Sequence, residues 1–241
     1  RAVRVHGRVR AQAVSAMSGE PEAPGWAAID AALARLYGRQ VPHQFASQTA
    51  YELDTPSPLP AIAVYEAVRP MHWHFVTYGL SELFEKTSED PNVSGFGFEL
   101  TMRTPRTPDE TVPPTWPLRA LQGLGRYVLA QRQGLDTGHC AELGSSIAAG
   151  IDSALTCLAC VPDPLLKKIV TPFGSLLFLQ VVGVTTDELA AMQRIDHEGV
   201  VNLLGELDFH GITDPARRSY FLDPNKAPVL RRYQLGVLLE R

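Results

Sequence analysis

Ser94-Gly95-Phe96-Gly97-Phe98-Glu99-Leu100-Thr101-Met102-Arg103 is the stretch that decides the fold. Side chains alternate between the two faces of a strand, so the large apolar residues of this stretch are predicted to share one face. These are Phe96, Phe98, Leu100 and Met102. The other face begins with two glycines and continues with Glu99, Thr101 and Arg103, so a bulky side chain or a ligand could approach the backbone there. None of these residues forms a catalytic pattern, and the stretch is interpreted as a framework strand.

A proline-rich turn follows, and Pro113-Pro114-Thr115-Trp116-Pro117 leads into a predicted helix. Pro117 falls in the first helical turn, where its missing N–H group costs nothing. The apolar side chains after it recur at helical spacing and predict one buried stripe. They are Leu118, Leu121, Leu124, Val128 and Leu129. Gly134 supplies the expected stop.

Upstream of this region, the patterns predict a helix and a hairpin. Pro24 and Gly25 open the helix, in which apolar residues recur at helical spacing, and Gly38 ends it. Residues 61–68 and 72–78 alternate as two strands and are predicted to pair as a β-hairpin.

Downstream, residues 176–182 are apolar on both faces, as expected for a central strand covered on both sides. Thr185 and Glu188 have capping-box spacing at the start of a helix, and residues 200–207 predict another. Residues 147–161 fit a strand or a helix equally well. The sequence therefore predicts a single α+β domain with a central mixed β-sheet flanked by helices.

The predicted domain spans residues 24–224. Residues 1–23 are expected to be a flexible or non-native extension, because residues 1–16 contain four arginines and no acidic residue, and Met17 is a plausible natural start. A basic tail for an anionic surface is the alternative. Residues 225–241 are expected to form a C-terminal extension, loosely attached from Asp223 onward.

Composition excludes several classes. The 241 residues are 45% hydrophobic and 20% charged, which suits a chain with a sizeable core. A net charge of −4 and a pI near 6.0 argue against a nucleic-acid binder. No apolar run is long enough to predict a membrane span. Three cysteines do not make a disulfide framework, so a cytoplasmic location is expected.

His72-Trp73-His74 is the best metal candidate, because two histidines one residue apart on a strand point the same way. A third ligand would have to come from His43, His139 or Glu66. The alternative is structural, with both histidines on a half-buried sheet face beside Val76 and Tyr78 and satisfied by hydrogen bonds. The structural interpretation is favoured, and no cofactor is expected.

Two other pairs receive structural interpretations. Cys157 and Cys160 have the C-x-x-C spacing of zinc ligands and redox dithiols, but their flanks are apolar, which favours core packing. Asp187 and Glu188 are interpreted as charges at a helix N-terminus rather than an acid–base couple.

Several of these stretches, in this order, resemble the suppressor of fused domain family. The resemblance is carried by Pro24-Gly25-Trp26, by His72-Trp73-His74-Phe75 running into Gly79-Leu80-Ser81-Glu82-Leu83, by residues 94–101 and 113–117, by Gln122-Gly123-Leu124, and by residues 171–184. It implies a non-enzymatic fold that binds protein. The animal member resembles this chain over its N-terminal half and clamps a transcription-factor peptide between two domains, and an acidic residue at the position of Glu82 contacts that peptide. These residues resemble only the first of the two domains, so the clamp is not expected to transfer.

Stand-alone bacterial relatives imply a different role, that of immunity proteins that neutralise toxin domains. The leading hypothesis is therefore a protein-binding module, either an immunity-type inhibitor or an adaptor. Its partner would be a toxin domain or an extended peptide, and its contacts would be exposed groups near Glu82, His72 and His74. The second hypothesis is a metal-dependent hydrolase using His72 and His74, and a third is an oligomer-forming domain.

Overall fold

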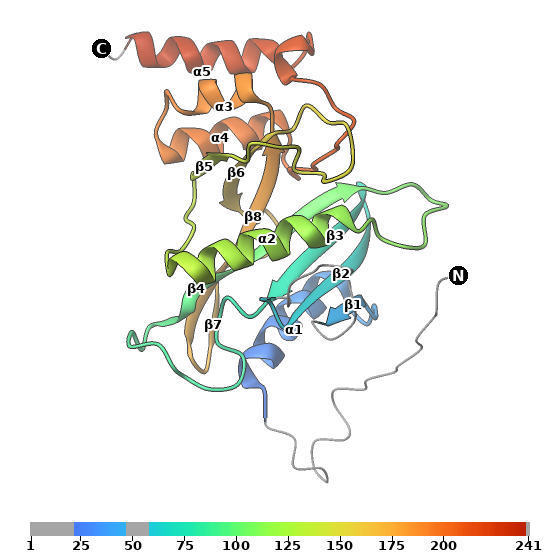
Figure 1. Cartoon of the computed structure of the whole chain (residues 1–241), viewed down its shortest axis with the longest axis vertical. Coiled ribbons are helices and arrows are strands. Elements are labelled where there is room, and N and C mark those ends of the chain that lie inside the picture. The colour runs from blue at the N-terminus through green and yellow to red at the C-terminus, as the bar shows by residue number, and fades with distance from the viewer. Residues whose placement is uncertain (1–21, 47–57, 240–241) are drawn as a thin grey trace.

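The computed structural model describes residues 22–46 and 58–239 (Figure 1). The predicted extension 1–23, with Met17 and the arginine-rich start, lies almost wholly outside these residues. The elements in chain order are α1 (Pro24–Tyr37), β1 (His43–Ala46), β2 (Ala61–Val68), β3 (Met71–Tyr78), β4 (Val93–Pro105), α2 (Trp116–Gln131), β5 (Cys140–Glu142), β6 (Cys157–Pro162), β7 (Ile169–Thr171), β8 (Gly174–Val184), α3 (Thr186–Met192), α4 (His197–Leu207), the 3-10 turn η1 (Tyr220–Leu222) and α5 (Ala227–Leu239). No helix among the described residues is both long and apolar enough to cross a membrane.

The strands of the described ranges form one eight-stranded mixed sheet in the order β1-β2-β3-β4-β8-β6-β5, with β7 also paired to β8. β4 and β8 run parallel, and the other pairings are antiparallel. β2 and β3 form the predicted hairpin, with Val64 opposite Phe75. β8 lies between β4 and β6, which confirms the predicted central strand. The α+β fold with a central mixed sheet is confirmed.

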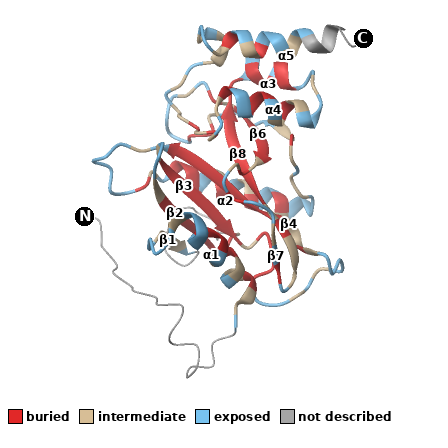
Figure 2. Cartoon of the chain, turned by 180° about the vertical axis from the view of Figure 1, so that it is seen from behind, coloured by how far each residue is buried: buried red, intermediate tan, exposed pale blue. Residues whose placement is uncertain are grey.

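Helices α1 and α2 cover opposite faces of the sheet (Figures 1 and 2). Alternation along β2 divides its side chains between them. Val64 packs in the cluster that contains Leu121 of α2, whereas Ala63 packs in the cluster that contains Leu33 of α1. Figure 2 shows the long strands of the sheet, such as β3, β4 and β8, buried along most of their length between these layers. Because both faces are covered, a polar side chain on either face must find a partner inside the protein.

A third group of helices, α3 to α5, packs at the end of the sheet formed by β6 and β8 (Figure 1). Leu230 of α5 is fully buried there, and Ala227 is 5% exposed. The expectation that the chain is loosely attached after Asp223 was therefore wrong, because the apolar face of α5 completes this cluster. The domain boundary at residue 224 stays a prediction.

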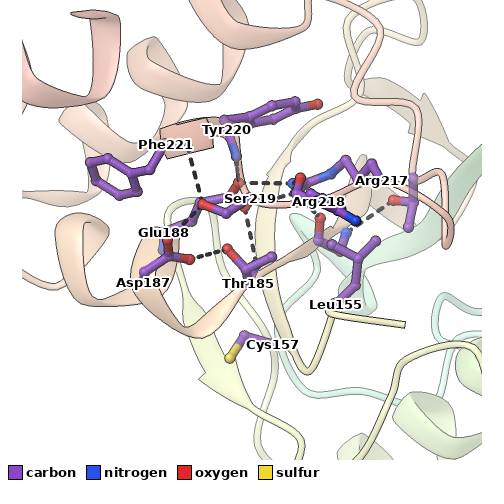
Figure 3. Close-up of polar contacts among 12 residues, drawn as sticks. Leu155, Cys157, Thr185, Asp187, Glu188, Arg217, Arg218, Ser219, Tyr220 and Phe221 are labelled. Carbon is purple, nitrogen blue, oxygen red and sulfur yellow. Dashed lines mark hydrogen bonds and ion pairs between the residues drawn. The ribbon is translucent and has the colours of Figure 1, made fainter. Parts of the chain in front are cut away.

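The chain between α4 and α5 is tied to the start of α3 by charged contacts (Figure 3). Arg217 donates from both terminal nitrogens to the two carboxylate oxygens of buried Glu188, at 2.8 and 2.7 Å. Glu188 also accepts from the Thr185 N–H at 3.0 Å and closes the predicted capping box. Asp187 accepts from the Ser219 hydroxyl at 2.6 Å. The interpretation of both acids as structural is confirmed.

The ambiguous residues 147–161 contain one regular element, the start of β6 at Cys157. The preceding chain is irregular, although Ile147 and Leu155 are buried and the Ile147 N–H donates to the Leu155 carbonyl at 2.8 Å. The apolar residues of this segment are buried, as their pattern indicates, but buried chain need not form a helix or a strand.

Candidate functional site

The loop between β3 and β4, residues 79–92, folds back across the start of β4. The Phe96 N–H donates to the Leu80 carbonyl at 2.9 Å. Gly95 has a φ of 57°, and a Cβ atom there would come within 2.6 Å of the Leu80 oxygen. Glycine is therefore required at this crossing. The space over Gly95 is therefore occupied by the backbone of the returning loop at Leu80.

Glu99 holds the first half of the 79–92 loop in place through hydrogen bonds to its carboxylate. Its side chain is fully buried, and one carboxylate oxygen accepts from the N–H groups of Gly79 and Ser81, each at 2.9 Å, and from the Ser81 hydroxyl at 2.6 Å. The other accepts from the Thr77 hydroxyl at 2.7 Å. Burial raises the pKa of Glu99, and the hydrogen bonds from Ser81, Thr77 and Gly79 oppose that rise. The face that begins with Gly95 and Gly97 thus also carries a buried acid, Glu99, that organises the loop.

Glu82 fixes the second half of the same loop. One of its oxygens accepts from the N–H groups of Thr87 and Ser88 at 2.5 and 2.6 Å, and the other lies 3.0 Å from the Lys86 ammonium. Burial opposes ionisation, but the hydrogen bonds from Ser88, Thr87 and Lys86 lower the pKa of Glu82 to about 2. Lys86 also donates to the Phe173 carbonyl at 2.9 Å, which joins the loop to the turn before β8.

The outer side of the loop is acidic and carries an exposed aromatic ring. Phe84 is 49% exposed, and Glu85, Glu89 and Asp90 are exposed as well. Glu82 and Lys86 are paired to each other, so the three outer carboxylates are the charges that this loop presents. The loop therefore displays one aromatic ring among negative charges, on a backbone held by two buried acids.

His72 and His74 lie on one face of β3, as predicted, with ring centroids 6.3 Å apart. The two histidines were expected on a half-buried face and Glu82 beside exposed contact groups; their exposed fractions are 1%, 0% and 8%, so all three side chains are buried. His74 lies between the Tyr37 hydroxyl, 2.7 Å from its Nδ1, and Asp163, 3.2 Å from its Nε2. Burial and the nearby Arg103 guanidinium lower the pKa of His74 to about 4 and that of His72 to about 3.

The third ligands considered for a metal site lie elsewhere. His43 and Glu66 face each other at 3.7 Å on the side of Trp73, the opposite face of β3, and the His139 ring lies against His197. Among the described residues, no group of three or more His, Cys, Asp or Glu side chains is placed to hold a metal ion. The structure gives the metal-dependent hydrolase no support.

The two cysteines of the C-x-x-C pair point to opposite faces of β6. Cys157 packs in the α3–α5 cluster and Cys160 in the α2 cluster, and both are fully buried. Positions three residues apart alternate sides on a strand, so this spacing separates the thiols instead of pairing them. Burial raises the pKa of Cys160 to about 12. The core-packing interpretation is confirmed.

A sequence model of the suppressor of fused protein (SUFU) family matches residues 55–218 of the chain. The chain belongs to the suppressor of fused family. The human and mouse suppressor of fused homologues are each 36% identical over 210 residues, which is 79% of this chain and 43% of each relative. The chain thus spans less than half the length of these relatives. The family prediction is confirmed.

Solved structures agree with this assignment. A chain from the Sufu–Fu complex superimposes with a TM-score of 0.76 at 32% identity, covering 88% of this chain and 98% of the other. Drosophila Suppressor of Fused gives a TM-score of 0.75 at 32% identity, covering 88% of this chain and 55% of that one. A suppressor of fused homologue from Neisseria gonorrhoeae, at 13% identity and a TM-score of 0.52, shares the fold.

Sequence reasoning missed two features of this region. Phe84 was not selected, although an aromatic residue between Glu82 and Glu85, outside the predicted strands, was a visible signal. Asp163 was also missed. It follows β6 and meets Arg103 only in the folded chain, and no local spacing marks such a pair.

Proposed function

We propose that this chain is a protein-binding module whose 79–92 loop contacts a basic segment of a partner protein, with Phe84 inserted into an apolar site on that partner. The proposal concerns binding and not catalysis. The single observation that carries it is an exposed aromatic ring among three exposed carboxylates, on a loop whose backbone is held by Glu99 and Glu82.

This combination suits recognition for physical reasons. A large aromatic side chain can bury much apolar area in a partner at little cost in conformational entropy. The carboxylates of Glu85, Glu89 and Asp90 attract a basic segment and disfavour acidic competitors. A loop already held in one conformation loses little further entropy on binding.

Glu82, His72 and His74 enter this proposal as positioning residues. Glu82 holds the N–H groups of Thr87 and Ser88 and so sets the direction of the outer loop. His72 and His74 lie within β3, the strand that leads into the loop. Their predicted role in partner binding would therefore be exerted through the loop, without direct contact.

The relatives support protein binding in general. A chain 32% identical to this one comes from a structure described as the Sufu–Fu complex. Within this class we propose a stoichiometric adaptor or regulatory protein acting in the cytoplasm. An immunity-type inhibitor of a toxin domain is the second candidate, because a net charge of −4 together with an acidic loop complements a basic toxin.

The test is co-purification of the partner from lysate of the native host, using tagged variants. Wild-type protein and Phe209→Ala, a control at another exposed aromatic residue (59% exposed), should retain the same partner. Phe84→Ala should weaken retention at least about tenfold, as expected for an aromatic anchor. Wild-type levels of retention by both Phe84→Ala and the triple charge reversal of Glu85, Glu89 and Asp90 to Lys would refute the proposed surface.

A toxin assay separates the two roles. If the captured partner is a toxin domain, an equimolar amount of this protein should suppress its activity, and Phe84→Ala should not. If the partner has no toxic activity, the adaptor role stands and the immunity role falls.

A further inference from the structure

A second surface with the features of a binding site lies away from the 79–92 loop. A groove of about 620 Å³ separates α2 from the chain that contains β5 and residues 143–149. Its lining includes six large apolar or aromatic side chains, namely those of Leu124, Tyr127, Leu135, Leu143, Ile147 and Leu158. Its volume falls in the range of roughly 300–1,000 Å³ typical of ligand sites. No residue of the 79–92 loop lines it.

The strand on the wall of this groove is an edge strand. β5 is the last strand in the sheet order and pairs only with β6 among the described strands. Two hydrogen bonds bracket the pairing. The Leu143 N–H donates to the Thr156 carbonyl at 2.9 Å, and the Cys160 N–H donates to the His139 carbonyl at 2.8 Å. They identify which residues of β5 face β6.

In an antiparallel pair, residues alternate between those that bond to the neighbouring strand and those whose N–H and C=O groups point away. With Cys140 opposite Ala159 and Glu142 opposite Cys157, the bracketing bonds make both of these non-hydrogen-bonded pairs. The N–H and C=O groups of Cys140 and Glu142 therefore point outward, whereas those of Ala141 point to β6. The outer edge of β5 presents two donors and two acceptors.

The free edge and the groove coincide. Ala141 lies opposite Leu158, and both line the groove on the α2 side of the sheet. A strand added to the edge of β5 would alternate in the same way, so every second side chain would enter the groove. The remaining side chains would lie on the face of Glu142, whose exposed carboxylate favours a basic neighbour.

We propose that β5 and this groove bind an extended segment of a partner protein by strand addition, with alternate apolar side chains in the groove and a basic side chain beside Glu142. An extended segment is the occupant because an outward row of backbone donors and acceptors is satisfied by another strand. A compact apolar ligand would fill the groove and leave that row unpaired. The site is additional to the 79–92 loop and does not depend on it.

The probe is a fluorescently labelled, capped hexapeptide of three Val-Lys repeats, titrated with the full chain at physiological ionic strength and followed by fluorescence polarisation. In either orientation one set of its side chains is apolar and the other is basic. The control is a peptide of the same composition in the order Val-Val-Val-Lys-Lys-Lys, which has the same charge but cannot alternate.

Four variants test the geometry of the site and its independence from the 79–92 loop. Glu142→Pro removes an outward N–H and no bond to β6, so binding should weaken about tenfold while the fold is kept. Glu142→Ala keeps that N–H and should bind more tightly than Glu142→Pro. Gly123→Leu adds a side chain at a groove-lining position of α2 that has no atom within 4 Å of the new Cβ, so it should block the groove without disturbing the fold. Phe84→Ala should bind the peptide like the wild type, which separates this site from the proposed loop.

Hydrogen exchange supplies the decisive readout. On peptide binding, the amides of Cys140 and Glu142 should become protected, and the Ala141 amide, already bonded to β6, should change little. The proposal is overturned if the alternating peptide binds no better than the control, if Gly123→Leu binds it unchanged, or if protection appears without involving Cys140 and Glu142. Self-association through this edge, detected by sedimentation and abolished by Glu142→Pro, would replace the partner segment by a second copy of the chain and overturn the proposal.

Discussion

His74 Nε2 lies 3.2 Å from Asp163 Oδ2, and both side chains are fully buried. The other oxygen of Asp163 accepts from Arg103 at 2.8 Å, and the Tyr37 hydroxyl lies 2.7 Å from His74 Nδ1. The contacts join α1, β3, β4 and the chain after β6. We assign the positive charge of this group to Arg103 and a neutral imidazole to His74, because burial and Arg103 lower the pKa of that histidine to about 4. Asp163 is therefore the ionised partner on which the group depends.

Replacing Asp163 by Asn should be strongly destabilising. The substitution leaves the Arg103 guanidinium buried without an anion, and loss of one partner of a buried pair costs about 3–5 kcal/mol. Urea unfolding followed by circular dichroism measures the loss. Glu206→Gln, which removes the exposed pair with Arg232, is the matched control and should leave the midpoint almost unchanged. Similar effects of the two variants would mean that the Asp163 group contributes no more than a surface pair.

Stability should fall with acid as the buried histidines are forced to take up protons. Burial and Arg103 lower the folded-state pKa values of His74 and His72 to about 4 and 3 from the ordinary 6.5. Between these values and 6.5 the unfolded chain binds more protons, so their contribution is complete above pH 6.5 and is lost as the pH falls toward 4. His74→Gln should reduce the slope of stability against pH in that window. A slope equal to that of the wild type would contradict the assignment of a neutral His74.

The elements predicted correctly were those whose ends are set by residues close by in the sequence. Pro24 and Gly38 bound α1, and Thr185 with Glu188 caps α3, because each of these signals acts within a few residues of the backbone. The same limit explains the failure at α5. Its attachment depends on a buried contact of Leu230 with a cluster built from α3, α4 and β6, and no pattern within the tail reports that cluster.

The sequence and the structure direct the proposal to the same loop, but through different residues. The loop after β3 was identified through Glu82, which was expected to be an exposed charge. Its carboxylate instead accepts hydrogen bonds from the backbone N–H groups of Thr87 and Ser88. The exposed side chains of the loop are those of neighbours such as Phe84 and Glu85. Likewise, alternation placed Glu99 and Arg103 on one face of β4, but it could not show that this face is closed by the returning loop and by Asp163. The alternation of side chains along a strand predicts which face each residue lies on. Whether that face is buried depends on tertiary contacts that the alternation does not contain.

Gly95 and Gly123 should respond oppositely to substitution by alanine. Gly95 has a φ of 57° and lies against the Leu80 carbonyl, so a Cβ atom is both strained and obstructed. Gly95→Ala should lower the free energy of unfolding by about 1–3 kcal/mol. Gly123 lies within α2 with open space around its Cβ position, so Gly123→Ala should raise stability by about 1 kcal/mol through helix propensity. Thermal denaturation of the two variants and the wild type measures both changes in stability. If both substitutions lowered stability, the open space around the Cβ position of Gly123 would be contradicted.

Arg217 should control how firmly the chain between α4 and α5 is held. Its guanidinium contacts both oxygens of Glu188, donates to the Gly183 carbonyl at 2.8 Å and lies 4.0 Å from the Tyr220 ring centre (Figure 3). Arg217→Ala leaves the buried Glu188 carboxylate without a cation and should cost about 3–5 kcal/mol. Arg217→Lys keeps the charge but cannot make the two-pronged contact, so its loss should be intermediate.

The neighbouring Arg218 offers the matched control, because it is exposed and one residue away. Hydrogen exchange of the α5 amides, read at the same protein stability in mild denaturant, separates local release from global unfolding. We expect Arg217→Ala to accelerate exchange in η1 and α5 far more than in β4, whereas Arg218→Ala should leave both unchanged. Uniform acceleration across the sheet would show that Glu188 and Arg217 stabilise the fold as a whole. Selective release would show that α3 to α5 form the part of this domain that opens first, because their attachment rests on one buried charge pair and on the cluster around Leu230.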